Sequence, residues 1–205
     1  MTVVKICGLT REEHVETAVA AGVDFVGFVF APSKRRISVE DAQRLSKKIP
    51  SHIKKVGVFV NATRDEIEQI AKDVPLDFIQ YHGDEKNEWI NSIGLPSIKA
   101  FSIHSKEDVE KAALYSVDYY LFDAPGTDYR GGSGHTFDWT LLEEAHISMD
   151  KVILAGGLHA ENVSQAIELV KPFGVDVSSG VEKDGMKDHD LIKAFLTEAK
   201  GAKKQ

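Results

Sequence analysis

The chain has 205 residues, of which 42% are hydrophobic and 28% are charged, and its formal net charge is −7. This composition is typical of one globular domain with a sizeable core, and the negative charge argues against nucleic acid as a partner. A single cysteine excludes an intrachain disulfide framework and a cysteine-rich zinc site. The first residues lack a signal-peptide pattern and no apolar run reaches the length of a membrane span, so we expect a soluble cytoplasmic protein.

Eight short apolar runs, each bounded by glycine or turn residues, are predicted to be β-strands. They cover Val3–Gly8, Phe25–Phe30, Lys55–Val60, Phe78–Gly83, Ser97–Ile103, Tyr119–Ala124, Lys151–Gly157 and Val175–Ser179. These runs are too apolar for a sheet with one face in water. They indicate a parallel sheet whose outer face is covered by helices.

Segments with helical spacing of apolar residues separate the predicted strands. The predicted helices are Arg11–Gly22, Val39–Ile49, Ile67–Val74, Trp89–Ile93, Val109–Ala113, Phe137–Ala145, Val163–Val170 and Leu191–Leu196. Ser38 and Thr63 stand where N-cap residues of the second and third helices are expected.

Eight strands alternating with eight helices favour an α/β fold that closes into a (β/α)8 barrel, or TIM barrel, as a single domain over residues 1–205. An open doubly wound sheet is the alternative, but Cys7-Gly8-Leu9-Thr10-Arg11 lacks the glycine-rich first turn of that fold. In a barrel, functional residues lie at the carboxyl ends of the strands. The longest interruption of the pattern, Pro125–Thr136, follows the sixth strand and is a candidate functional loop.

Two strands end in residues that can exchange protons. Cys7 ends the first predicted strand, where a thiol is either a buried packing residue or a reactive group. Asp123 ends the sixth, where partial burial would raise the pKa of its carboxyl group and suit a general acid, although a loop-tying aspartate is equally compatible. We expect positive potential, for example from Lys5, to lower the pKa of a catalytic thiol.

Glycine-bearing turns follow the seventh and eighth strands, at Gly156-Gly157 and at Ser178-Ser179-Gly180. Barrels frequently bind phosphate at these two loops through backbone N–H groups. Tight turns without a ligand are the structural alternative for such glycines. Two such turns at the two expected places favour a phosphate site.

Other polar residues near strand ends are candidate ligand contacts. Arg35 and Arg36, after the second strand, can hold a carboxylate, or can form part of a solvated turn. Gln80 and His82 are in phase on the fourth strand. The remaining histidines have no metal-ligand spacing, so we predict no metal site.

Taken in order, several segments resemble the phosphoribosylanthranilate isomerase family. They are Lys5-Ile6-Cys7-Gly8, Val26–Phe30 with Ser33-Lys34-Arg35, Val56–Val60, Gln80–Gly83, Leu121-Phe122-Asp123, Gly131–Gly134 with Thr136–Trp139, Ala155–Leu158 and Val175–Glu182. The resemblance runs from the first strand to the last helix, covers essentially the whole chain and is specific in combination.

The resemblance implies that Cys7 is the general base, Asp123 the general acid and Arg35 the contact to an anthranilate carboxylate. It implies a substrate-binding set of Arg35, Gln80, His82, Gly156, Gly157, Asp176, Ser178, Ser179 and Gly180. The implied reaction is an Amadori rearrangement in tryptophan biosynthesis. Ring opening and C2′ proton removal need one acid and one base, and no metal, nucleotide or redox cofactor. The expected partner is the small-molecule substrate, and the expected state is a monomer or homodimer.

Other functions remain open on the same scaffold. A sugar-phosphate epimerase that uses a metal would need more ligands than His82 and Asp123, and an indole-forming synthase would need an early lysine–glutamate pair where only Lys5 stands. A regulatory barrel that binds a phosphometabolite would need the glycine turns but not both Cys7 and Asp123. Loss of turnover with retained affinity in variants of this pair separates an enzyme from a binding protein.

Overall fold

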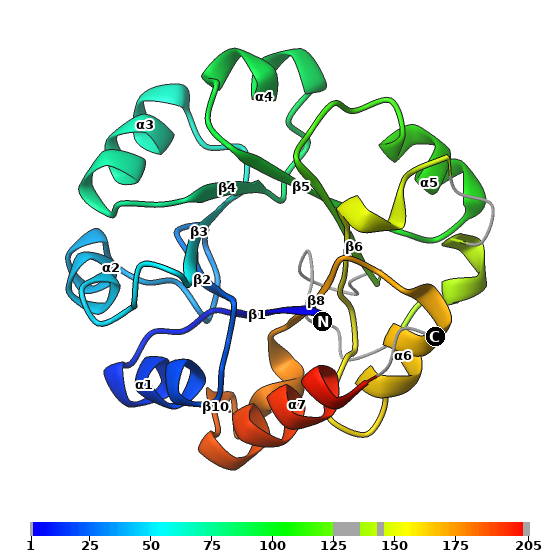
Figure 1. The fold of residues 1–205 in the computed structure, drawn as a ribbon. Helices are drawn as coiled ribbons and strands as arrows, with labels where there is room; N and C mark the ends of the chain where they lie inside the picture. The colour runs from blue at the N-terminus through cyan, green and yellow to red at the C-terminus, as the bar shows by residue number, and fades with distance from the viewer. Residues whose placement is uncertain (1, 125–135, 143–145, 203–205) are drawn as a thin grey trace.

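The computed structural model describes residues 2–124, 136–142 and 146–202, and its centre is a closed barrel of parallel strands ringed by helices (Figure 1). The strands are β1 Val3–Cys7, β2 Phe25–Val29, β3 Lys54–Phe59, β4 Phe78–Tyr81, β5 Ser97–Ser102, β6 Tyr119–Asp123, β7 Val152–Leu154 and β8 Gly174–Val177. Each strand pairs with its neighbour in the chain, and β8 pairs with β1 to close the barrel. The predicted α/β barrel is therefore confirmed, with strand ends that differ by one to three residues.

The helices lie outside the barrel. They are α1 Glu12–Ala20, α2 Val39–Ser46, α3 Arg64–Asp73, α4 Asn87–Ile93, α5 Lys106–Ala112, α6 Val163–Val170 and α7 His189–Gly201. The predicted caps of α2 and α3 form, because the side chains of Ser38 and Thr63 accept hydrogen bonds from the backbone N–H groups of Asp41 and Glu66. None of the helices in the described part of the chain is long and apolar enough to cross a membrane.

The predicted sixth helix is wrong over the part of it that the structure describes. A short 3-10 helix, η1 Trp139–Leu142, stands in its place, and Ala145 lies outside the described residues. The side chain of Asp138 accepts hydrogen bonds from the backbone N–H and the hydroxyl of Thr140, at 3.0 and 2.7 Å. Such local bonding competes with a regular helix. Residues 125–135 of the candidate functional loop also lie outside the described residues.

Three short elements near the carboxyl end of the chain were not predicted. The 3-10 helices η2 Met149–Lys151 and η3 Ser179–Val181 precede β7 and follow β8, and a two-stranded hairpin pairs β9 Glu182–Lys183 with β10 Met186–Lys187. The hairpin turns through Asp184 and Gly185, both with positive φ, which is the Asp-Gly turn typical of two-residue hairpin loops.

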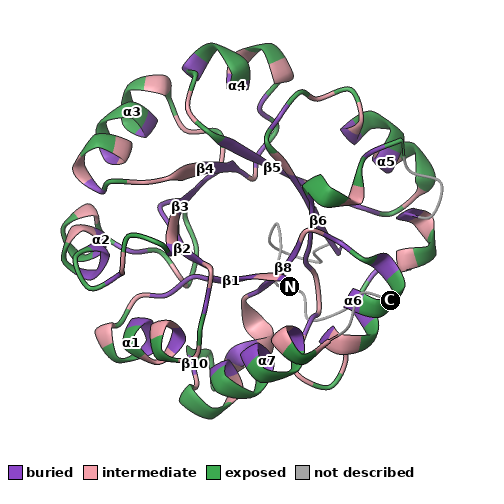
Figure 2. Ribbon diagram, in the orientation of Figure 1, coloured by how far each residue is buried: buried purple, intermediate pink, exposed green. Residues whose placement is uncertain are grey.

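The two ends of the barrel interior differ in chemistry. At the amino end, where the strands begin, rings of Phe25, Phe78, Tyr119 and Phe173 pack together, with the Tyr119 and Phe173 centroids 4.4 Å apart. The strands themselves are buried almost throughout, as Figure 2 shows. Polar side chains instead gather toward the carboxyl end. Among the described residues, the side chains inside the barrel that could take part in chemistry therefore lie toward its carboxyl end.

Candidate active site

A cavity of about 100 Å³ opens at the carboxyl end of the barrel. Its lining contains most of the residues that the sequence singled out, namely Cys7, Arg35, Gln80, His82, Asp123, Asp176 and Ser178. These residues come from β1, β4, β6 and β8 and from the loops that follow β2, β4 and β8. Closure of the barrel brings them to one place from positions that are far apart in the sequence.

Cys7 lies at the end of β1, directly opposite Gly27 of β2. A Cβ atom at Gly27 would lie 3.0 Å from the Cys7 sulfur and 3.2 Å from the Lys5 Nζ atom, so the missing side chain makes room for both groups. Lys5 is fully buried inside the barrel and its Nζ atom donates to an oxygen of Asp176 at 2.9 Å. An ammonium group therefore lies beside the thiol, paired with a carboxylate.

The expected direction of the Cys7 pKa is wrong. Burial raises the pKa of the Cys7 thiol above its ordinary value, although the ammonium groups of Lys5 and Lys187 act in the opposite direction. Asp176 adds to the rise, because its carboxylate disfavours a second negative charge nearby. The sequence indicated the cation but not the degree of desolvation that opposes it.

The expected rise of the Asp123 pKa is confirmed. Burial, reinforced by the charge of Asp176, raises the pKa of the Asp123 carboxyl to about 7. The Nε2 atom of His82 lies 3.7 Å from an Asp123 oxygen. His82 also contacts Gln80 through its Nδ1 atom at 3.1 Å, while the Gln80 Oε1 atom is buried and has no hydrogen-bond partner among the described residues.

Arg35 and Arg36 have different environments. Arg35 lines the cavity and donates two hydrogen bonds to Glu182, from Nε at 2.6 Å and from Nη2 at 2.9 Å. Gly8 makes this placement possible, because a Cβ atom there would lie 2.7 Å from the Arg35 Cδ atom. Arg36 is exposed and does not line the cavity. The structure thus separates the two arginines, which the sequence had not done.

The two glycine turns lie side by side beyond β7 and β8. A Cβ atom at Gly180 would lie 1.9 Å from the carbonyl oxygen of Leu158, so the turns are in close contact. Gly156 and Gly157 both have positive φ. No acceptor among the described residues binds the backbone N–H of Gly157 or Ser179. Of the residues in these turns, only Ser178 lines the cavity. The others lie outside its lining, namely Gly156, Gly157, Ser179 and Gly180.

Sequence reasoning missed two parts of the site. The first is an apolar wall of Val29, Ala31, Val58 and Val60 next to Cys7. The second is Glu182, whose carboxylate accepts hydrogen bonds from both Arg35 and the buried Lys187. Strand alternation could have identified the wall. No pattern in the sequence pairs residues 35 and 182, which are 147 positions apart.

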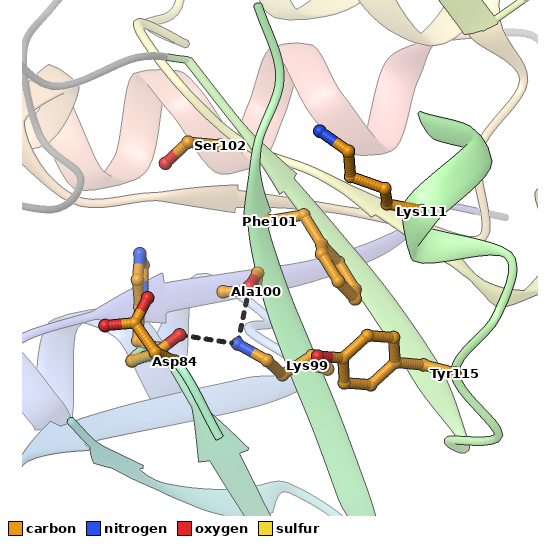
Figure 3. A pocket seen from close by; sticks show the side chains of 9 residues that line it. Asp84, Lys99, Ala100, Phe101, Ser102, Lys111 and Tyr115 are labelled. Atoms are coloured by element: carbon orange, nitrogen blue, oxygen red, sulfur yellow. Dashed lines mark hydrogen bonds between the residues drawn. The ribbon is translucent and has the colours of Figure 1, made fainter. Parts of the chain in front are cut away.

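A second cavity of about 480 Å³ shares the lining residue His82 with the first. It lies between β4, β5 and α5, and its lining includes Asp84, Phe101, Ser102 and Lys111 (Figure 3). Lys99 forms part of its floor, where its Nζ atom donates to the carbonyl oxygens of Gly83 and Ala100 at 2.8 and 3.0 Å. Those contacts fix the turn after β4 that carries His82. Within the described residues, no group of three or more His, Cys, Asp or Glu side chains is arranged to hold a metal ion.

Comparisons with known proteins agree with this geometry. The family model described as N-(5'phosphoribosyl)anthranilate (PRA) isomerase matches residues 4–198. An N-(5'-phosphoribosyl)anthranilate isomerase from Listeria innocua is 48% identical over 202 residues, which are 98% of this chain and 100% of the relative.

Two solved structures extend the comparison. A phosphoribosyl anthranilate isomerase in complex with reduced 1-(o-carboxyphenylamino)-1-deoxyribulose 5-phosphate has a TM-score of 0.87 and 43% identity, covering 98% of this chain and 100% of that one. A structure of monomers of the dimeric isomerase from Thermotoga maritima has a TM-score of 0.86 and 42% identity, with the same coverage. This chain therefore belongs to the phosphoribosylanthranilate isomerase family.

Proposed function

We propose that this chain converts N-(5-phospho-β-D-ribosyl)anthranilate into 1-(2-carboxyphenylamino)-1-deoxy-D-ribulose 5-phosphate, with Asp123 as general acid and Cys7 as general base. The observation that carries this assignment is that a thiol and a carboxyl group from β1 and β6 line one cavity with Arg35. This activity, an aldose–ketose isomerisation in tryptophan biosynthesis, is that of the family to which the chain belongs.

The first step opens the ribose ring. A proton goes from the Asp123 carboxyl to the ring oxygen, the C1′–O bond breaks, and the nitrogen lone pair forms the C1′ iminium. A carboxyl with a pKa of about 7 holds this proton near neutral pH and releases it readily, as a general acid must. The ring oxygen stays on C4′ as a hydroxyl group.

The second step removes the C2′ proton. The Cys7 thiolate takes this proton, the C2′ electrons form a C1′–C2′ double bond, and the iminium nitrogen becomes an amine. The resulting enolamine then gains a proton at C1′ and loses the C2′ hydroxyl proton to become the ketone. The Lys5 ammonium beside Cys7 stabilises the thiolate that starts this step, and Asp176 holds that ammonium in place.

The rest of the cavity is suited to the two ends of the substrate. The apolar wall beside Arg35 can pack against the anthranilate ring while the guanidinium group binds its carboxylate. The backbone N–H groups of Gly157 and Ser179 have no acceptor among the described residues, and phosphate is the ligand that such turns bind. The unpartnered Oε1 atom of Gln80 can accept from a hydroxyl group of the open sugar chain.

The direct test uses the purified chain and freshly prepared phosphoribosylanthranilate. We expect the fluorescence of the anthranilate group to change as the substrate is consumed. We also expect Cys7→Ser and Asp123→Asn to bind the product with near wild-type affinity and to lose orders of magnitude in turnover. A wild-type chain that binds this compound without converting it would favour the regulatory-barrel alternative. A crystal grown with sulfate tests the phosphate site separately: the anion should lie against the Gly157 and Ser179 amides, and an anion held only by surface lysines would contradict it.

The cellular setting and assembly belong to the same proposal. We propose a cytoplasmic enzyme, because its phosphorylated substrate is a charged intermediate that does not cross membranes unaided. We propose a monomer or a homodimer, in line with the dimeric relative from Thermotoga maritima. Sedimentation of the purified chain distinguishes the two, and a larger assembly would contradict both.

A further inference from the structure

We propose that Glu182 is a positioning residue for substrate binding, because it fixes the Arg35 guanidinium group that binds the substrate carboxylate. This inference rests on the proposed function and deepens it. The Glu182 carboxylate joins two cations, because it accepts from Arg35 at 2.6 and 2.9 Å and from the Lys187 Nζ atom at 2.6 Å. Its side chain is only 10% exposed, so water competes weakly for these bonds.

The contact to Arg35 determines which edge of the guanidinium group is left for a ligand. Glu182 occupies the edge formed by Nε and Nη2. A guanidinium group has five N–H donors, so three remain, two on Nη1 and one on Nη2, and the edge between these two atoms can form a second two-pronged bond to a carboxylate. Glu182 therefore orients Arg35 and leaves hydrogen-bond donors for a ligand. It also blocks the Nε–Nη2 edge of the guanidinium group against an incorrectly placed anion.

The contact to Lys187 extends the same support to the turn after β8. The three donors of the Lys187 ammonium group go to Glu182, to the Ser178 carbonyl oxygen at 2.9 Å and to the Ser178 hydroxyl at 3.3 Å. The Ser178 hydroxyl in turn donates to the Cys7 carbonyl oxygen at 3.2 Å. All three donors are engaged, so the role of Lys187 is to hold the loop and not to bind the substrate.

The β9–β10 hairpin places Glu182 and Lys187 opposite each other. Glu182 and Lys187 are paired across it, and its Asp184-Gly185 turn reverses the chain within two residues. The hairpin thereby delivers a lysine to a glutamate whose other face holds an arginine from the loop after β2. The ammonium group of the buried Lys187 would be strongly unfavourable at this position without the carboxylate.

The test compares two ligands on matched variants. The first ligand is the reaction product, and the second is the same compound without the ring carboxylate. For Glu182→Gln we expect affinity for the product to fall about tenfold and affinity for the carboxylate-free compound to fall much less, because only the first ligand uses the oriented edge of Arg35. We expect KM to rise by a similar factor and kcat to change less than about threefold.

Arg35→Met supplies the second arm. In that background Glu182→Gln should no longer distinguish the two ligands, because the group that it orients is gone. Glu68→Gln is the matched control, since Glu68 pairs with Arg64 on the exposed face of α3 and should leave every constant unchanged. Glu182→Asp keeps the charge but is too short for both cations, and it should give a smaller loss of the same kind if Glu182→Gln folds poorly.

The outcomes separate the two claims. A wild-type chain that does not convert phosphoribosylanthranilate contradicts the proposed function. A wild-type chain that converts it, with a Glu182→Gln variant that loses equal affinity for both ligands or adds its full loss to that of Arg35→Met, overturns the positioning role.

Discussion

The cysteine and aspartate halves of the site differ in which neighbouring charge acts on them most. After burial, which raises both pKa values, the Lys5 ammonium has the largest effect on Cys7 and opposes the rise, whereas the Asp176 carboxylate has the largest effect on Asp123 and adds to it. Burial acts on both groups in the same direction, toward the neutral form. It therefore helps the acid, which must hold its proton, and hinders the base, which must lose its own. The cations around Cys7 are the compensation that the base requires and the acid does not.

The largest expected effect comes from removing the base. Cys7→Ser keeps the shape of the side chain but replaces the thiol with a hydroxyl that does not ionise near neutral pH. We expect kcat to fall by about 10²- to 10⁴-fold, the usual contribution of general base catalysis, while product affinity stays near that of the wild type. Stopped-flow fluorescence and equilibrium titration measure the two quantities. Turnover close to that of the wild type would reduce Cys7 to a packing residue and make His82, 3.7 Å from Asp123, the next candidate base.

The pH profile distinguishes the two halves directly. The active form has a thiolate and a neutral carboxyl, yet the pKa of the thiol is raised while that of Asp123 is about 7. Below pH 7 the thiolate fraction limits the rate, so kcat/KM should rise about tenfold per pH unit. Between the two pKa values the gain in thiolate cancels the loss of protonated Asp123, and kcat/KM should be flat before it falls at higher pH.

A different pH profile would contradict this prediction. A maximum below pH 7 followed by a fall at neutral pH would mean that the substrate-ready site lowers the pKa of the thiol below that of Asp123. In the residual activity of Asp123→Asn, the break near pH 7 should disappear, because the group that produces it is gone. Persistence of that break would assign it to another group.

The sequence predicted which residues form the two halves but not how they are tuned. Strand periodicity and the glycine turns placed Cys7 and Asp123 at one end of a barrel, because both signals are local. The tuning depends on pairs that are distant in the chain, such as Lys5 with Asp176, which are 171 positions apart. The sixth helix failed for a different, local reason: Phe137 and Leu142 are buried and have a helical spacing, but the Asp138 side chain accepts hydrogen bonds from Thr140 two residues away.

A third expected effect concerns the arginine that shares the cavity with Cys7. Arg35→Met should weaken binding of the product by roughly 1.5–3 kcal/mol, which is the usual range for a hydrogen bond to a charged group. Arg36→Met is the matched control, because Arg36 is exposed and lies outside the cavity. Isothermal titration of both variants at two salt concentrations measures the difference. Equal losses at the two positions, both reduced by salt, would show general attraction of an anion and no specific contact.

The smallest expected effect is on stability, and it belongs to the aspartate half. The folded-state pKa of Asp123, about 7, lies above its ordinary value near 3.8, so ionisation of this carboxyl opposes folding. Its stabilising, protonated form is fully present below the ordinary value and is lost as the pH rises through 7. Between pH 5 and pH 8 the wild type should therefore lose about 2–3 kcal/mol of stability through this group, since each pKa unit corresponds to about 1.4 kcal/mol.

Asp123→Asn removes this dependence, because the amide stays neutral at every pH. In urea unfolding, we expect the variant to gain about 2 kcal/mol or more on the wild type as the pH rises from 5 to 8, while it loses turnover. Cys7→Ser should show no comparable gain over this range, because the folded-state pKa of the thiol is raised and the group remains largely neutral. Parallel pH curves for the wild type and Asp123→Asn would mean that the carboxyl is solvated or paired in solution. The neutral acid of the mechanism would then have to come from elsewhere in the site, and the contrast between the two halves would fail.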